Sequence, residues 1–150
     1  VSGYLPFDVQ GRTVLAGRLH VGSILNGAVQ DIPAPQRFFA GGGGSVRGFG
    51  FQEVGPRLAD NTPQGGLSLM EASGELRHRL NDHWGLVAFL DAGTVGGQQF
   101  PTFRDLSIGA GVGVRYNLGF GPLRVDIATP VTDRKGAAPF QIYVSIGQSF

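Results

Sequence analysis

The sequence predicts an all-β fold, an antiparallel transmembrane β-barrel to which these 150 residues contribute about seven strands. Apolar and polar side chains alternate with a period of two, and the links between these segments alternate between short and long. Only 15% of residues are charged, against roughly 25% in soluble domains. No apolar stretch approaches the roughly 20 residues of a transmembrane helix, so any span must be a strand of a closed barrel.

The alternation is clearest over residues 106–118. Even positions there carry Leu, Ile, Val, Ala or Tyr, whereas odd positions carry Ser, Gly, Arg or Asn. Because successive side chains of a strand point to opposite faces, one face is predicted to contact lipid and the other the lumen. Residues 123–131 and 140–150 repeat the pattern, and four more strands are predicted at residues 4–9, 12–25, 66–80 and 84–95.

The links between the predicted strands fall into two interleaved sets. Short links lie at residues 10–11, 81–83 and 117–122, and longer ones at residues 26–65, 96–104 and 133–139. Outer-membrane barrels alternate short periplasmic turns with long external loops in this way. The pattern therefore predicts that Phe150 lies on the periplasmic side.

A soluble antiparallel β-sandwich is the alternative, because its strands also alternate. Two features favour the barrel. The face opposite the apolar one is rich in Gly and Ser rather than Lys and Glu, and aromatic residues gather near strand ends, as in interfacial girdles. These aromatic residues are Tyr116, Phe120, Phe140 and Phe150.

Charge and motifs argue against several functions. A net charge of +1 without a Lys/Arg block gives no footprint for nucleic acid, and the absence of Cys removes thiolate metal sites and Cys nucleophiles. His20, His78 and His83 lack metal-ligand spacing, and no nucleophile elbow or phosphate loop occurs. Glu71 and Glu75 share a strand face, which we interpret as a lumen surface. We predict no enzyme activity, metal, cofactor or small-molecule substrate.

The glycine-rich segment 37–51 is the most specific stretch of the chain. Arg47 lies there between small and aromatic residues, as expected of a loop that folds into a confined space. A confined guanidinium needs an acidic partner, because an unpaired buried charge is costly. Glu75 and Asp91 are the candidates, since each is a carboxylate on the predicted inward face of a strand.

The run Val46-Arg47-Gly48-Phe49 resembles the lumen-facing loop motif of the BamA/TamA superfamily of outer-membrane assembly barrels, also called the bacterial surface antigen family. The resemblance extends from about Arg12 onward, and the run from Arg37 to Gly42 is most like the autotransporter assembly factor TamA. Further segments that resemble the family's C-terminal barrel half are residues 73–76, 89–95, 109–116, 121–126 and 146–150.

The resemblance implies a 16-stranded barrel preceded by periplasmic POTRA domains. Residues 1–150 would be the C-terminal part of that barrel, with a lumen-folded loop at about 27–65, and would lack the POTRA domains and the first strands. A secretory signal is not seen at the start and is expected upstream or removed. The lateral seam of the barrel could not form within one copy, so we expect this piece alone to be inactive.

The resemblance also implies roles for individual residues. Arg47 would pair with Glu75 and Asp91 as a lock rather than as a catalytic group. Gly147 matches a glycine at which a kink weakens the seam, although an ordinary small lumen-facing residue is an equal alternative, and Phe150 would end the terminal strand.

The function that the resemblance implies is insertion or export of client proteins at the bacterial outer membrane. The alternatives are a two-partner secretion transporter of the same superfamily and a passive outer-membrane pore. The implied partners are outer-membrane lipid, client outer-membrane or autotransporter proteins, and an inner-membrane-anchored TamB-like protein.

Overall fold

The computed structural model describes residues 1–132 and 138–147, which form one antiparallel sheet of seven strands in sequence order. The all-β prediction with about seven strands is confirmed, and the two-layer sandwich is not formed, because all these strands belong to one sheet. The strands are β1 (Ser2–Pro6), β2 (Thr13–Ser23), β3 (Ser68–Arg79), β4 (Trp84–Gly96), β5 (Ser107–Asn117), β6 (Pro122–Pro130) and β7 (Gln141–Ile146).

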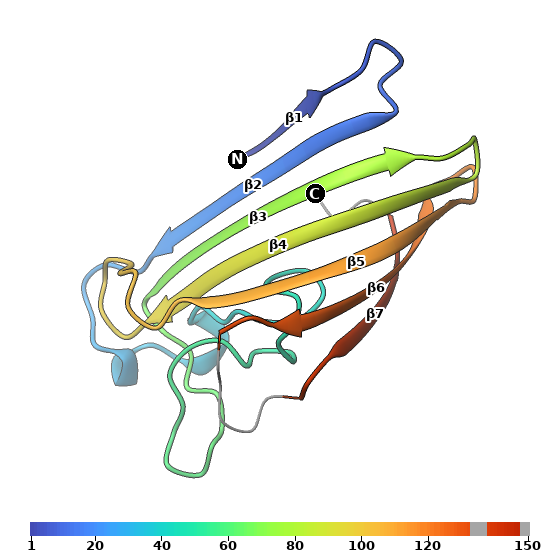
Figure 1. Cartoon of the computed structure of the whole chain (residues 1–150). Helices are drawn as coiled ribbons and strands as arrows, with labels where there is room; N and C mark the ends of the chain where they lie inside the picture. Colours follow the sequence, from blue (N-terminus) through green and yellow to red (C-terminus); the bar gives the residue numbers. More distant parts are fainter. Residues whose placement is uncertain (133–137, 148–150) are drawn as a thin grey trace.

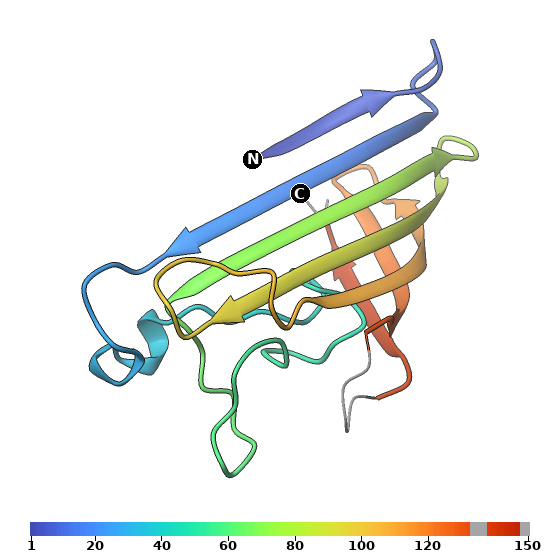
Figure 2. The same ribbon diagram turned by 60° about the vertical axis from the view of Figure 1, so that its left-hand side comes forward.

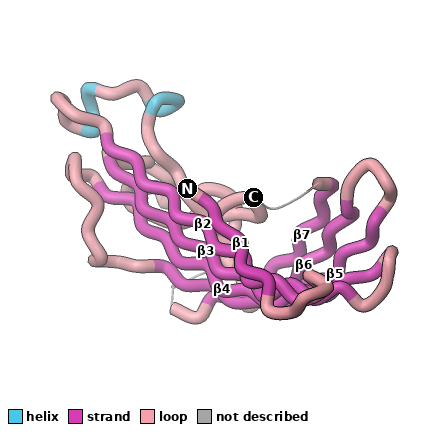
Figure 3. Tube along the Cα trace, turned by 90° about the horizontal axis from the view of Figure 1, so that it is seen from above, coloured by secondary structure: helices cyan, strands magenta, loops and turns pink. Residues whose placement is uncertain are grey.

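The sheet curves into an open trough, which is plain when it is seen from above (Figure 3). In the described residues each strand pairs with its neighbours in sequence, and β1 and β7 are the two edges. The link between β2 and β3 contains two short 3-10 turns, η1 (Val29–Asp31) and η2 (Ala34–Gln36), and runs beneath the sheet in Figures 1 and 2. Among the described residues, no helix is long and apolar enough to cross a membrane.

The two faces of the sheet differ in chemistry, as the alternation predicts. The convex face exposes large apolar side chains, and the concave face buries polar ones such as Glu75, Asp91 and Asp126. In a soluble sheet apolar side chains are buried and polar ones are exposed. Here the reverse holds, which fits a barrel wall between lipid and lumen. The exposed apolar side chains of the central strands include Leu76, Leu86, Leu90, Val112, Val114, Val125 and Ile127.

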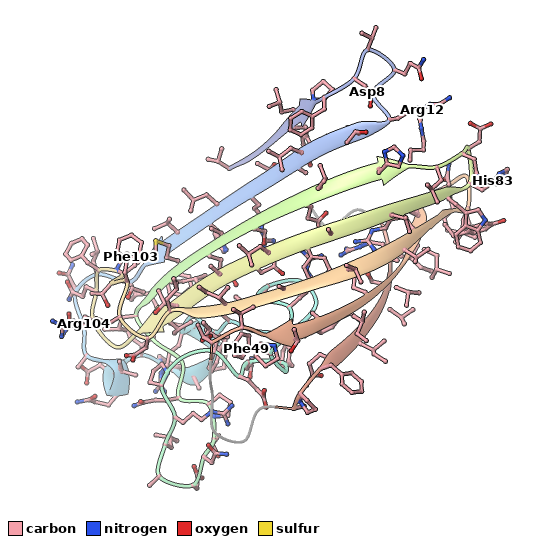
Figure 4. The ribbon with its side chains drawn as sticks, viewed as in Figure 1. Asp8, Arg12, Phe49, His83, Phe103 and Arg104 are labelled. Atoms are coloured by element: carbon pink, nitrogen blue, oxygen red, sulfur yellow. The ribbon has the colours of Figure 1, made fainter. Side chains whose placement is uncertain are left out.

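The two ends of the sheet also differ. The short turns gather at the end where Asp8, Arg12 and His83 lie, and the long links gather at the end of Phe103 and Arg104 (Figure 4). Trp84 and Tyr116 meet edge to face near the short-turn end, with ring centroids 4.7 Å apart. Trp84 is exposed and Tyr116 is half-buried, and aromatic rings at strand ends are typical of an interfacial girdle.

Two predicted strands differ from the observed bounds by more than two residues at one end, and the others by one or two residues. The first was expected at residues 4–9 but is Ser2–Pro6, because Asp8 accepts hydrogen bonds from the backbone N–H groups of Arg12 and Thr13 and closes a turn. The last was expected at residues 140–150, whereas β7 ends at Ile146, before Gly147 with a φ of +106°. Residues 148–150, including Phe150, lie outside the described residues.

A charge on the convex face is expected to be costly if that face contacts lipid. Val112→Arg, in the middle of β5, should lower the free energy of unfolding by about 2–4 kcal/mol, because the guanidinium would lie in hydrocarbon. Gln141→Arg, on the concave side of β7, is the control and should change it by less than about 1 kcal/mol. Urea unfolding of the full-length protein in phospholipid vesicles measures both, and equal losses would contradict a lipid-facing convex side.

Candidate functional site

The long link 24–67 is held against the concave face by a small apolar core of its own. Short bridges join Phe38 to Gly66 and Ala40 to Val54, and they fold the link back on itself. Phe49 and Val46 at its tip are fully buried, and Figure 4 shows Phe49 beneath the sheet. Burial of a Phe or Val side chain stabilises by about 1.5–3 kcal/mol. The core comprises Ala40, Val46, Phe49, Val54, Leu69 and Val95, with Phe38 packed against it.

Arg47 lies between these two apolar side chains and is only 2% exposed. Its guanidinium binds Asp91 of β4 with both carboxylate oxygens, Nε to Oδ2 at 2.6 Å and Nη2 to Oδ1 at 2.9 Å. The backbone N–H of Arg47 also donates to Asp91 Oδ2, at 3.1 Å. Bidentate pairing of this kind fixes orientation as well as position. Asp91 therefore holds both the side chain and the main chain of the loop tip.

Two further carboxylates and an aromatic ring complete the surroundings of Arg47. Nη1 lies 2.6 Å from Glu75 Oε1 of β3 and 3.4 Å from Asp126 Oδ2 of β6. The guanidinium carbon lies 3.5 Å from the ring centroid of Phe89, a favourable cation–π geometry. Burial alone would lower the pKa of Arg47, but the hydrogen bonds and charge of Asp91, with the charge of Glu75, raise it above the ordinary value. Arg47 is therefore permanently charged.

The carboxylates around Arg47 are themselves shared with other arginines of the wall. Glu75 pairs with Arg77 at 2.7 Å, and Asp126 pairs with Arg115 and with Arg124, the latter at 3.3 Å. A buried ion costs several kcal/mol to desolvate, so such a network is stable only when every charge has a partner. Loss of Arg47 would remove the ion pair of the buried Asp91, whereas Glu75 would keep Arg77 and Asp126 would keep Arg115 and Arg124.

The loop tip can approach the sheet because the strands beneath it carry glycine on their concave side. A Cβ at Gly109 of β5 would lie 1.8 Å from the carbonyl oxygen of Arg47, and one at Gly93 of β4 would lie 2.5 Å from Val46 Cγ2. A Cβ at Gly113 would collide with the Asp126 carboxylate. The loop tip therefore packs against the glycine-rich strand face that the sequence predicts.

Two other contacts fix the flanks of Arg47. The Tyr143 hydroxyl of β7 accepts a hydrogen bond from Gly48 N and donates one to Phe49 O, at 3.0 and 2.8 Å. On the other flank, Ser45 donates to the carboxylate of Glu71, which also lies 3.2 Å from His20 Nδ1. The five strands from β3 to β7 thus all contact the loop residues from Ser45 to Phe49.

The structure brings together most of the residues that the sequence singles out. Val46, Arg47, Gly48 and Phe49 meet Glu75 and Asp91 on the concave face. Sequence reasoning missed Asp126 and Tyr143 as partners, although Asp126, like Glu75 and Asp91, is a carboxylate on the polar face of a predicted strand. Elsewhere Gly147 bends the chain after β7, and its N–H donates to Pro122 O at 2.9 Å.

The histidines stand apart from one another in this arrangement. His20 contacts Glu71, His78 Nδ1 lies 2.9 Å from Thr13 Oγ1, and His83 stacks on Tyr116. Within residues 1–132 and 138–147, no group of three or more His, Asp or Glu side chains is arranged to hold a metal ion.

The packing of the loop tip against glycine can be tested without changing a charged residue. Gly109→Ala should destabilise the protein by about 1–3 kcal/mol and release the loop to protease, because its Cβ meets main-chain atoms that cannot rotate away. Gly74→Ala is the matched control on β3, where an added Cβ meets nothing within 4 Å. Limited proteolysis and urea unfolding of the full-length protein measure both effects. Equal sensitivity of the two variants would show that the loop tip does not pack against Gly109.

Comparisons with known proteins agree with this geometry. The Omp85 superfamily domain model matches residues 1–150. Among solved structures, the chain is similar to BamA from Haemophilus ducreyi lacking POTRA domains 1–3, with a TM-score of 0.73 and 25% sequence identity. That likeness covers 94% of this chain and 32% of the BamA chain, so this chain spans about a third of its length. The chain belongs to the Omp85 superfamily, and its seven-stranded sheet has the fold of part of the BamA barrel.

Proposed function

We propose that this chain is the C-terminal part of a bacterial outer-membrane β-barrel that inserts or translocates client proteins. Membership of the Omp85 superfamily and the likeness to BamA support this proposal. In it, the described strands are about the last seven of a 16-stranded barrel, with POTRA domains before it. The apolar convex face contacts lipid, and the concave face lines the lumen.

Pairing at a strand edge supplies the physical step. In the described part of the chain β7 pairs with β6 alone, and its six residues are followed by a bend at Gly147. An unpaired strand edge is a template for another strand, and in hydrocarbon its unsatisfied N–H and C=O groups make pairing strongly favourable. A seam beside β7 that opens easily therefore lowers the barrier for a client strand to pair and enter, without a nucleotide.

The observation that carries the proposal is the buried Arg47 network. A passive pore needs an unobstructed lumen, and nothing in that role calls for a loop tip held by three carboxylates from three different strands. In an assembly barrel the same network holds the concave wall in one curvature while the seam moves. Arg47 is a positioning residue in this mechanism, and Asp91, Glu75 and Asp126 hold it.

The finer assignment that we propose is an autotransporter assembly factor like TamA, with an inner-membrane-anchored partner like TamB. It is supported by the run from Arg37 to Gly42, which resembles that branch. In the structure this run leads directly into the loop tip, where Arg37 donates hydrogen bonds to Ile32 O and Gln64 O and closes the base of the loop.

Replacement of Arg47 tests the assembly role. Arg47→Ala in the full-length protein should abolish client assembly, because it leaves the buried carboxylate of Asp91 without its ion pair at a cost of about 3–5 kcal/mol and frees the loop tip from β3 and β6. Arg47→Lys should recover little, since an ammonium cannot bind Asp91 through two parallel hydrogen bonds. The measurement is the amount of folded client in outer-membrane fractions after depletion of the native protein.

Arg57→Ala provides the control in the same loop. Arg57 is partly exposed and makes a long ion pair of 3.8 Å with Glu53, so its loss should leave assembly at the native level. Folded amounts of each variant are compared first by antibody and by protease resistance of the loop. Native assembly by Arg47→Ala, with the loop still resistant, would overturn the proposal.

A further inference from the structure

A recess of about 720 Å³ lies on the concave side at the short-turn end of the sheet, away from the loop core. Arg77 of β3 is the register partner of Val14 on β2 and of Val87 on β4. Arg115 of β5 is the partner of Gly85, which lies two residues before Val87 on β4. These positions share the face of Glu75, so the recess opens toward the lumen. Its charged lining is Arg12, Arg77, Arg79 and Arg115, with Asp82 as the lining carboxylate.

Arg115 of the recess lies beside a second guanidinium group and shares a carboxylate with it. Arg115 of β5 and Arg124 of β6 are direct cross-strand partners, and like charges in that position repel each other. Asp126 serves both of them and also contacts Arg47. One carboxylate is therefore divided among three guanidinium groups.

The rim of the recess adds positive charge that the loop network does not use. Arg12 and Arg79 are exposed, and Arg79 donates a long hydrogen bond of 3.5 Å to the carbonyl oxygen of Gln10. Asp8 lies in the neighbouring turn, but its carboxylate already accepts the backbone N–H groups of Arg12 and Thr13. The positive surplus of the recess is thus concentrated at its mouth.

We propose that this recess binds an acidic segment of extended polypeptide that enters the lumen from the short-turn end. The proposal deepens the proposed function and rests on it, because the segment would belong to a client. Positively charged walls around a concave site attract such a segment and hold it mainly by electrostatics.

The width of the recess favours a polypeptide over a single anionic group. Its arginines extend from the start of β2 to β5, three inter-strand spacings, or about 14 Å at roughly 4.8 Å each. A phosphate group spans a few ångströms, whereas about four residues of extended chain at roughly 3.3 Å per residue match that width. The recess also lies on the lumen side, opposite the apolar face that we assign to lipid.

Binding of a defined peptide to the full-length protein in nanodiscs tests the proposal. The probe is a fluorescent peptide of about eight residues with alternating Glu and Ser, compared with the same peptide carrying Gln in place of Glu. We expect the Glu peptide to bind at least about tenfold more tightly, with the difference lost at high salt. Arg12→Gln combined with Arg79→Gln should weaken its binding by about tenfold, and Arg57→Gln at the far end should not change it.

Each alternative result overturns the proposal. Equal affinity for the Glu and Gln peptides, or unchanged affinity in the double variant, shows that the recess does not select acidic chain. Displacement of the peptide by an equal concentration of inorganic phosphate, or by anionic lipid in the nanodisc, assigns the cations to a small anion or a headgroup. If the full-length protein assembles clients but does not prefer the Glu peptide, this inference alone is overturned. The assembly role itself is tested separately by the Arg47 variants.

Discussion

The ion pair between Arg47 and Asp91 is the interaction on which the rest of the arrangement depends. A guanidinium at 2% exposure is tolerable only because Asp91, Glu75 and Asp126 converge on it from β4, β3 and β6. Those strands are not all neighbours, so satisfying one charge fixes the spacing of a large part of the wall. The same ion pairs therefore fix both the curvature of the sheet and the position of the loop.

That constraint explains the composition of the chain better than barrel geometry alone does. A lumen wall needs only polar side chains, yet the concave side of β5 carries glycine at positions 109, 111 and 113. At Gly109 the space that a side chain would fill holds the Arg47 carbonyl, and at Gly113 it holds the Asp126 carboxylate. The opposite face of the same strand keeps large aliphatic residues, because nothing in the loop constrains it.

Much of this follows from the sequence, because a period of two is a local signal and a mid-strand carboxylate is a conspicuous exception to it. Strand number and the inward position of Glu75 and Asp91 were predictable on that basis. Asp126 meets the same criterion and was not used. The roles of Ser45 and Tyr143 could not be predicted, because their contacts depend on the path of the loop, which is fixed only when distant strands meet. The end of β1 was misplaced because the turn that closes it depends on the Asp8 carboxylate.

The loop network and the basic recess are coupled by the carboxylates that they share. Arg77 and Arg115 compete with Arg47 for Glu75 and Asp126, so the negative charge available to the loop depends on what else neutralises those two arginines. An acidic segment in the proposed recess would satisfy Arg77 and Arg115 and leave Glu75 and Asp126 to Arg47. Reciprocity of linked equilibria then requires that a seated loop strengthen binding of the segment by the same factor. Occupation of the recess and retention of the loop therefore favour each other.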